Sequence, residues 1–216
     1  MADKSHVLRV HPENPEKKII NRAAESIEKG GTVIFPAQYL YGMAADAFSE
    51  ESVRRIFAIK KRPLQKPLLV LIKNFKQLET LTAGIPEAGG KLMQAFWPGN
   101  VTIIFTASDL VPGLVTAGSG RIGIRMPLHP VARALVERLD SPVTGTSANV
   151  SEKPGCDSVE NLDPAVLENT DLVLDAGRLK SGIGSTLVDV TSEPARIVRQ
   201  GEIPAEDIFS IIAQGY

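Results

Sequence analysis

The chain has 216 residues, of which 43% are hydrophobic and 23% charged, as in a globular protein with one sizeable core. The net charge is −1, and Cys156 is the only cysteine, which excludes a disulfide framework within one chain. No apolar run is long enough to span a bilayer, and residues 1–18 lack the apolar segment of a signal peptide, so we expect a cytoplasmic protein without membrane contact.

The first half of the chain predicts helices and strands in alternation. Residues 15–29 have apolar side chains at helical spacing, and a Gly-Gly pair follows them. Ser49 is a good N-cap for a helix from Glu50 to about Lys60. Asn74 likewise caps a short helix, in which we expect Phe75, Leu78 and Leu81 to point inward. The other predicted elements are buried strands over 32–36 and 67–72, a helix over 86–97 and a strand over 101–105.

The second half is richer in strands. The predicted elements are a strand over 121–125, a helix over 130–139, a strand from 143 into the loop 144–151, strands over 172–175, 186–190 and 195–199, and a closing helix over 204–213. The last two strands have a turn signal between them and are expected to pair. Early alternation followed by successive strands predicts a single α/β domain with a mixed parallel and antiparallel sheet flanked by helices.

Several familiar site patterns are absent from the sequence. Gly118-Ser-Gly-Arg-Ile-Gly123 has the spacing of a dinucleotide fingerprint, but it leads into a strand where that fingerprint opens a helix. There is no P-loop and no nucleophile elbow. The three histidines have no partner at metal-ligand spacing, so we expect no metal held by protein side chains.

The charges are unevenly distributed along the chain. From Ser52 to Leu78 there is no acidic residue but there are eight lysines and arginines, and Leu110 to Val136 also lacks acids. A solvated helix face explains part of this pattern, but it explains poorly the cluster Lys60-Lys61-Arg62-Pro63, where a helix gives way to a loop. Two loops rich in Gly, Ser and Thr, at 144–151 and 182–186, are either self-capping turns or donors to an anion. Together these features favour an anionic ligand.

A set of ordered motifs carries a family resemblance. The motifs are Phe35-Pro36, Tyr41-Gly42, Ile59-Lys-Lys-Arg-Pro63, Lys66-Pro-Leu68, Trp97-Pro-Gly99, Arg125-Met-Pro127, Ser147-Ala-Asn149, Gly184-Ser-Thr186 and Arg199-x-Gly201. In this order they resemble the YrdC-like threonylcarbamoyl-AMP synthase family, in its single-domain form. The resemblance implies a strongly twisted mixed sheet with a concave basic cavity. It places an N-terminal extension at 1–14, the YrdC-like domain at 15–205 and the end of its last helix at 206–216.

The resemblance also implies roles for individual residues. Lys60 and Arg62 match the K-x-R pair that meets the nucleotide phosphates, and we expect them to be catalytic. The ATP contacts implied by the motifs are Lys60, Arg62, Lys66, Ser147, Asn149 and Arg199. The threonine contacts implied are Tyr39, Arg125 and Ser185.

The first motif departs from the family pattern. The family has P-T-D-T-x-Y-G where this chain has Pro36-Ala-Gln-Tyr-Leu-Tyr-Gly42, so Tyr39 replaces a threonine near the amino-acid substrate. Leu71 stands where some members have histidine, and Gly145 where some have a threonine or another small residue. These changes affect the expected threonine side of the site more than the nucleotide side.

The implied reaction joins ATP, L-threonine and bicarbonate into L-threonylcarbamoyladenylate and pyrophosphate for threonylcarbamoyladenosine modification of tRNA. Mg²⁺ is expected to be bound through the phosphates of ATP, and a tRNA threonylcarbamoyl transferase complex is the expected transient partner. Two alternatives stay open on the sequence alone. One is a non-catalytic module of the same fold that binds tRNA or another RNA through its basic stretches, and the other is an enzyme that adenylates a different acid.

Overall fold

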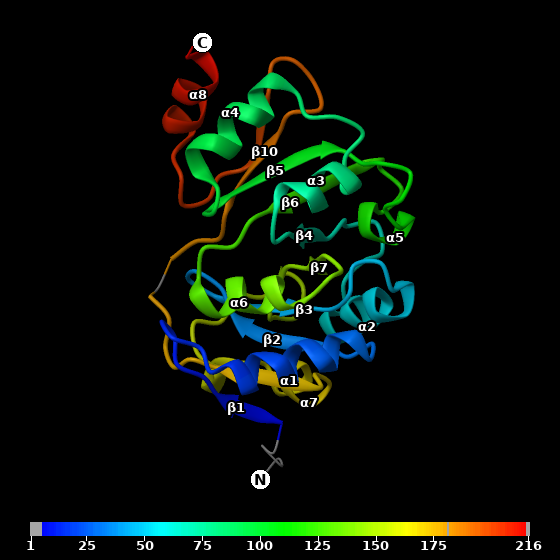
Figure 1. Cartoon of the computed structure of the whole chain (residues 1–216), viewed down its shortest axis with the longest axis vertical. Coiled ribbons are helices and arrows are strands. Elements are labelled where there is room, and N and C mark those ends of the chain that lie inside the picture. The colour runs from blue at the N-terminus through cyan, green and yellow to red at the C-terminus, as the bar shows by residue number, and fades with distance from the viewer. Residues whose placement is uncertain (1–5, 181, 215–216) are drawn as a thin grey trace.

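The strands of the chain form two mixed sheets, each covered by helices (Figure 1). The computed structural model describes residues 6–180 and 182–214. Residues 1–5 of the expected N-terminal extension and residues 215–216 lie outside this description. In the view of Figure 1 the five-stranded sheet lies in the lower half of the molecule and the six-stranded sheet in the upper half.

The five-stranded sheet has the order β1-β9-β2-β3-β8. β9 is parallel to both of its neighbours, whereas β3 is antiparallel to β2 and β8. β2 and β3 are buried along their whole length, so their side chains show no polar alternation. The strands are β1 (Val7–Arg9), β2 (Val33–Pro36), β3 (Tyr41–Ala44), β8 (Thr146–Ser147) and β9 (Leu172–Asp175).

The six-stranded sheet has the order β11-β10-β5-β6-β4-β7. β10 is parallel to β5 and β4 is parallel to β6, and the remaining pairs are antiparallel. β7 ends at Thr144 and β8 begins at Thr146, so the chain passes from one sheet to the other at Gly145. The strands are β4 (Leu69–Leu71), β5 (Val101–Thr106), β6 (Arg121–Arg125), β7 (Val143–Thr144), β10 (Thr186–Asp189) and β11 (Arg196–Arg199).

The helices cover the outer surfaces of the sheets. α1 and α6 pack on each other and against β9 and β2, while α4 packs on β5 and α8 on α4. Within the described residues, no helix combines the length and the apolar character needed to cross a membrane. The helices are α1 (Lys17–Glu28), α2 (Glu50–Lys60), α3 (Phe75–Leu81), α4 (Glu87–Phe96), α5 (Gly113–Thr116), α6 (Pro130–Arg138), α7 (Pro164–Glu168) and α8 (Ala205–Ala213), with a 3-10 turn at Val159–Asn161.

The predicted α/β class is confirmed, but the strands divide between two sheets where one was expected. The caps at Ser49 and Asn74 form as predicted, each accepting from a main-chain N–H three residues on. The expectation that Phe75 points inward was wrong, because this first residue of α3 is 51% exposed while Leu78 and Leu81 are buried. The strand β3 was not predicted, since its four buried residues include a glycine and lack any period.

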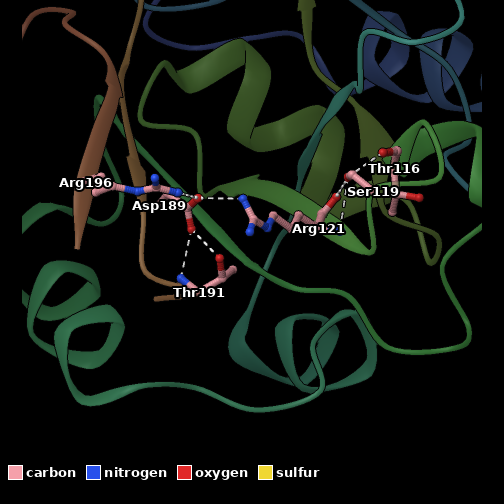
Figure 2. A network of polar contacts seen from close by, with 6 residues as sticks. All are labelled: Thr116, Ser119, Arg121, Asp189, Thr191 and Arg196. Carbon is pink, nitrogen blue, oxygen red and sulfur yellow. Dashed lines mark hydrogen bonds and ion pairs between the residues drawn. The ribbon is translucent and has the colours of Figure 1, made fainter. Parts of the chain in front are cut away.

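A buried carboxylate ties three strands of the six-stranded sheet together at one end (Figure 2). Asp189, at the end of β10, is 2% exposed and faces Arg121 of β6 at 3.1 Å and Arg196 of β11 at 3.4 Å. Its other carboxylate oxygen accepts from the N–H and the hydroxyl of Thr191, at 2.9 and 2.6 Å. The opposite ends of β6 and β11 carry Arg125 and Arg199, so the network fixes the strands that present these two arginines.

Candidate functional site

A cavity of about 390 Å³ is lined by strands of both sheets. The five-stranded sheet contributes residues of β2, β3 and β8, and the six-stranded sheet contributes residues of β4, β6, β10 and β11. The volume is that of a pocket for a small molecule. Six of the predicted site residues line this cavity, namely Tyr39, Arg62, Arg125, Ser147, Ser185 and Arg199.

Three arginines converge on the cavity from separate parts of the chain. Arg62 is held by the main-chain oxygens of Lys66 at 3.1 Å and Pro67 at 2.7 Å. Arg199 donates to the main-chain oxygen of Ser185 at 2.9 Å. The Nε atom of Arg125 is buried without a hydrogen-bond partner. Within residues 6–180 and 182–214, none of the three arginines forms an ion pair with a carboxylate.

The arginines therefore leave the cavity with uncompensated positive charge. Burial lowers the pKa of Arg62 and of Arg199 below the ordinary value. Burial, followed by the charge of Arg199, lowers the pKa of Arg125 to about 10. A guanidinium stays cationic at neutral pH, and each shift means that burial makes its charged form less favourable. An anionic ligand would relieve this cost.

Lys60 lies beneath the cavity and not on its wall. The side chain is buried, at 1% exposure, and its ammonium donates to the main-chain oxygen of Ser147 and to the main-chain and side-chain oxygens of Asn149, the latter two at 2.7 and 3.2 Å. Burial, followed by the charge of Arg62, lowers the pKa of Lys60 to about 7. The predicted contact of Lys60 with phosphate stays a prediction; in this structure its ammonium donates to Ser147 at the end of β8 and to Asn149 just after it.

Two further predicted nucleotide contacts are also outside the cavity wall. Lys66 is exposed and pairs with Glu152 at 2.8 Å. Asn149 is 7% exposed, and its amide nitrogen donates to the main-chain oxygens of Val150, at 3.0 Å, and Lys153. The side chains of both residues thus bond to other parts of the protein, and their predicted contact with ATP stays a prediction.

The three predicted threonine contacts, Tyr39, Arg125 and Ser185, all line the cavity, and Ser185 lies next to Arg199. Ser185 is 4% exposed, and its hydroxyl lies 2.7 Å from that of Thr102. The ring of Tyr39 packs against Gly182, where a Cβ atom placed on the glycine would lie 2.6 Å from the ring carbon Cγ. Burial, followed by the charge of Glu202, raises the pKa of Tyr39, which stays a neutral phenol at the cavity wall.

Sequence reasoning missed part of the apolar wall. Leu69 and Leu187 line the cavity, and no pattern in the sequence separates them from ordinary strand residues. Gly145 also lines it, and a Cβ there would lie 2.6 Å from Leu71 and 2.7 Å from Leu69. The two departures at Leu71 and Gly145 are therefore coupled, because the leucine occupies the space that a side chain at residue 145 needs.

The acidic, histidine and cysteine side chains of the described residues are the ones that could hold a metal ion. In the part of the chain that the structure describes, no group of three or more His, Cys, Asp or Glu side chains is placed to hold a metal ion. The cavity wall is basic, so a cation is suited to it only as the counter-ion of a polyphosphate ligand.

The fold and the cavity together define a mixed α/β protein with a cavity lined by three arginines. Residues 25–201 match the family model Sua5/YciO/YrdC, whose description is "Telomere recombination". This match covers most of the chain, which belongs to this family.

Proteins named threonylcarbamoyl-AMP synthase are similar to most of the chain. A threonylcarbamoyl-AMP synthase of Pyrococcus abyssi is 36% identical over 94% of the chain, and a putative one of Methanocaldococcus jannaschii is 31% identical over 96%. The chain covers 59% of the first protein and 99% of the second. The crystal structure of P. abyssi Sua5 complexed with L-threonine superposes with a TM-score of 0.89 at 36% identity, over 96% of this chain and 61% of that one. The chain thus spans about three fifths of the Pyrococcus protein.

Proposed function

We propose that the chain is a threonylcarbamoyl-AMP synthase, which makes L-threonylcarbamoyladenylate and pyrophosphate from ATP, L-threonine and bicarbonate. The observation that carries this proposal is the convergence of Arg62, Arg125 and Arg199 on one cavity without a carboxylate partner among the described residues. A triphosphate and an amino-acid carboxylate are the two anions that such a reaction must hold together. The relatives' names support the same reaction.

The chemistry requires positioning and charge neutralisation. The amine of threonine combines with bicarbonate, losing water, to give a carbamate. A carbamate oxygen then forms a bond to the α-phosphorus of ATP, the bond to the β-phosphate bridging oxygen breaks, and pyrophosphate leaves with the electron pair. The nucleophile is already anionic, so no general base is needed. The work of the protein is to align the reactants and to offset charge on the leaving group.

Each predicted residue that lines the cavity is assigned a contact with ATP or with threonine. Arg62 and Ser147 are proposed to contact the triphosphate, with Arg199 at the nucleotide. Arg125 is proposed to pair with the carboxylate of threonine, with Tyr39 and Ser185 beside it. Mg²⁺ fits this wall only as a counter-ion that the phosphates hold, where it supplies further charge neutralisation.

The product is proposed to serve threonylcarbamoyladenosine formation in tRNA, through transient contact with a tRNA threonylcarbamoyl transferase complex. We assign the reaction to the cytoplasm, where ATP and tRNA are present. Whether tRNA or another RNA binds this chain directly is an outcome of the test that follows.

The test is release of pyrophosphate from ATP by the purified chain, with threonine omitted in one arm and bicarbonate in another. The proposal predicts release only when both are present. Release without bicarbonate, or with another acid in place of threonine, identifies adenylation of a different substrate. No release in any arm, together with RNA binding that weakens steeply with salt, identifies the RNA-binding alternative.

A further inference from the structure

The ammonium group of Lys60 uses all of its hydrogen-bond donors within the protein. An ammonium has three N–H donors and no acceptor. In this structure it meets three oxygens, which are the main-chain oxygen of Ser147 and the two oxygens of Asn149. The side chain is 1% exposed, so no donor is left for solvent or for the cavity.

The main chain of Lys60 holds the same segment. Its carbonyl oxygen accepts from the N–H of Ser151 at 2.8 Å, so segment 147–151 is joined to the end of α2 from both the side chain and the backbone. The next residue, Lys61, adopts a left-handed conformation with φ of 49° and ends the helix. This turn lets Arg62 line the cavity while Lys60 lies beneath it.

The contacts continue from Asn149 to the cavity wall. The hydroxyl of Ser147 donates to the side-chain oxygen of Asn149, which also accepts from Lys60. Of these three residues, only Ser147 lines the cavity. The position of the Ser147 hydroxyl therefore depends on Asn149, and that of Asn149 depends on Lys60.

We propose that Lys60 is a positioning residue, which holds segment 147–151 in place so that Ser147 meets the triphosphate, and that it does not itself contact phosphate. This inference rests on the proposed function. It predicts that Lys60 acts on the nucleotide side of the site only, because Arg125 and Ser185 are held by strands of the other sheet. It also predicts that the effect of Lys60 passes through Asn149.

The kinetic test is a double-mutant cycle with Lys60→Met and Asn149→Ala, read as separate KM values for ATP and threonine. We expect each single variant to raise the KM for ATP about tenfold and to leave the KM for threonine within about twofold, and the double variant to be no worse than either. If the KM for ATP in the double variant rises by the product of the two single increases, Lys60 has an independent phosphate contact and the proposal is overturned. An equal rise in both KM values, or a fall in kcat alone, would show only a general structural role.

Lys73→Met is the matched control. The ammonium of Lys73 also donates to a main-chain oxygen, that of Leu139 at 2.8 Å, but Lys73 does not line the cavity. We expect this variant to leave the KM for ATP unchanged. A rise equal to that of Lys60→Met would mean that any loss of such a contact disturbs the site, which contradicts a specific role of Lys60.

A second measurement on the unaltered protein covers the case in which Lys60→Met does not fold. Lysines are labelled with an amine-reactive reagent, with and without an ATP analogue, and located by mass spectrometry. We expect Lys60 to stay unlabelled in both states, while Lys66 is labelled in the free protein. Labelling of Lys60 in the free protein that disappears with the analogue would show an open phosphate ligand. This readout needs no turnover, so it stays decisive even if the wild-type chain releases no pyrophosphate and the proposed function fails.

Discussion

Replacing Asp189 by asparagine tests how the six-stranded sheet holds its strands in place. The carboxylate is 2% exposed and accepts from Thr191 twice, while Arg121 and Arg196 face it from two other strands. Asparagine keeps one oxygen acceptor, but an NH₂ group replaces the other oxygen. This NH₂ group then faces either the donors of Thr191 or those of the two arginines. The two arginine side chains are 49% and 61% exposed, so their ion pairs contribute little by themselves. The main loss of stability comes from removing a buried charged acceptor that is surrounded by hydrogen-bond donors.

Hydrogen bonds to a charged group contribute about 1.5–3 kcal/mol each, so we expect Asp189→Asn to lower the free energy of unfolding by about 2 kcal/mol. For a chain of this size that corresponds to a melting temperature lower by about 4–8 °C. Urea and thermal unfolding measure it. Arg196→Met is the control and should cost less than about 1 kcal/mol. A loss below about 0.5 kcal/mol for Asp189→Asn, or an equal loss for the control, would show that the buried carboxylate does not hold these strands together.

The same variant has a predictable pH dependence. Burial raises the pKa of Asp189, but the hydrogen bonds from Thr191 and the charges of Arg121 and Arg196 outweigh it, so the pKa lies below the ordinary value of 3.8. The folded protein thus holds this proton less tightly than the unfolded chain. The difference in free energy of unfolding between wild type and variant has its full size above the ordinary pKa. It shrinks as the pH falls through the lower pKa of the folded state.

The remaining predictions concern the cavity and its supports. Arg62→Ala should abolish pyrophosphate release, and near-wild-type turnover would remove Arg62 from the role proposed for it. Gly201→Ala should destabilise the protein by about 1–3 kcal/mol in thermal unfolding, because the new Cβ would lie 2.3 Å from the main-chain oxygen of Gly184, while Gly84→Ala, with nothing within 4 Å, is the matched control. Affinity for an ATP analogue should fall as the pH rises through about 7, where the ammonium of Lys60 loses a proton and one of its three donors. An identical pH curve in Lys60→Met would exclude that cause.

Local signals predicted the elements whose ends are marked by caps or turns. The helix Glu50–Lys60 begins after the cap at Ser49 and has the predicted bounds, and the strand Arg121–Arg125 was located by its alternating pattern. β1 has no such signal. It forms because it pairs with β9, which lies more than 160 residues away in the chain, so no neighbouring residues mark it. The division into two sheets depends on the turn at Gly145, which moves the chain from one sheet to the other. No local pattern encodes that step.

The site was predictable in its charge but not in its geometry. Runs without acidic residues indicated an anionic ligand, and the family resemblance selected the arginines that line the cavity. Neither could separate Arg62, which faces the cavity, from Lys60 two residues earlier, which is buried beneath it. The two side chains diverge because Lys61 adopts a left-handed conformation between them, and a lysine in that conformation has no sequence signature.

Whether the cavity joins ATP to a carbamate of threonine is tested most directly by the mass of the product formed from ¹³C-bicarbonate. We predict an adenylate that carries threonine and one carbon from bicarbonate, so that its mass is one unit higher than that of the product formed from ordinary bicarbonate. An adenylate of the same mass with either bicarbonate would contradict it.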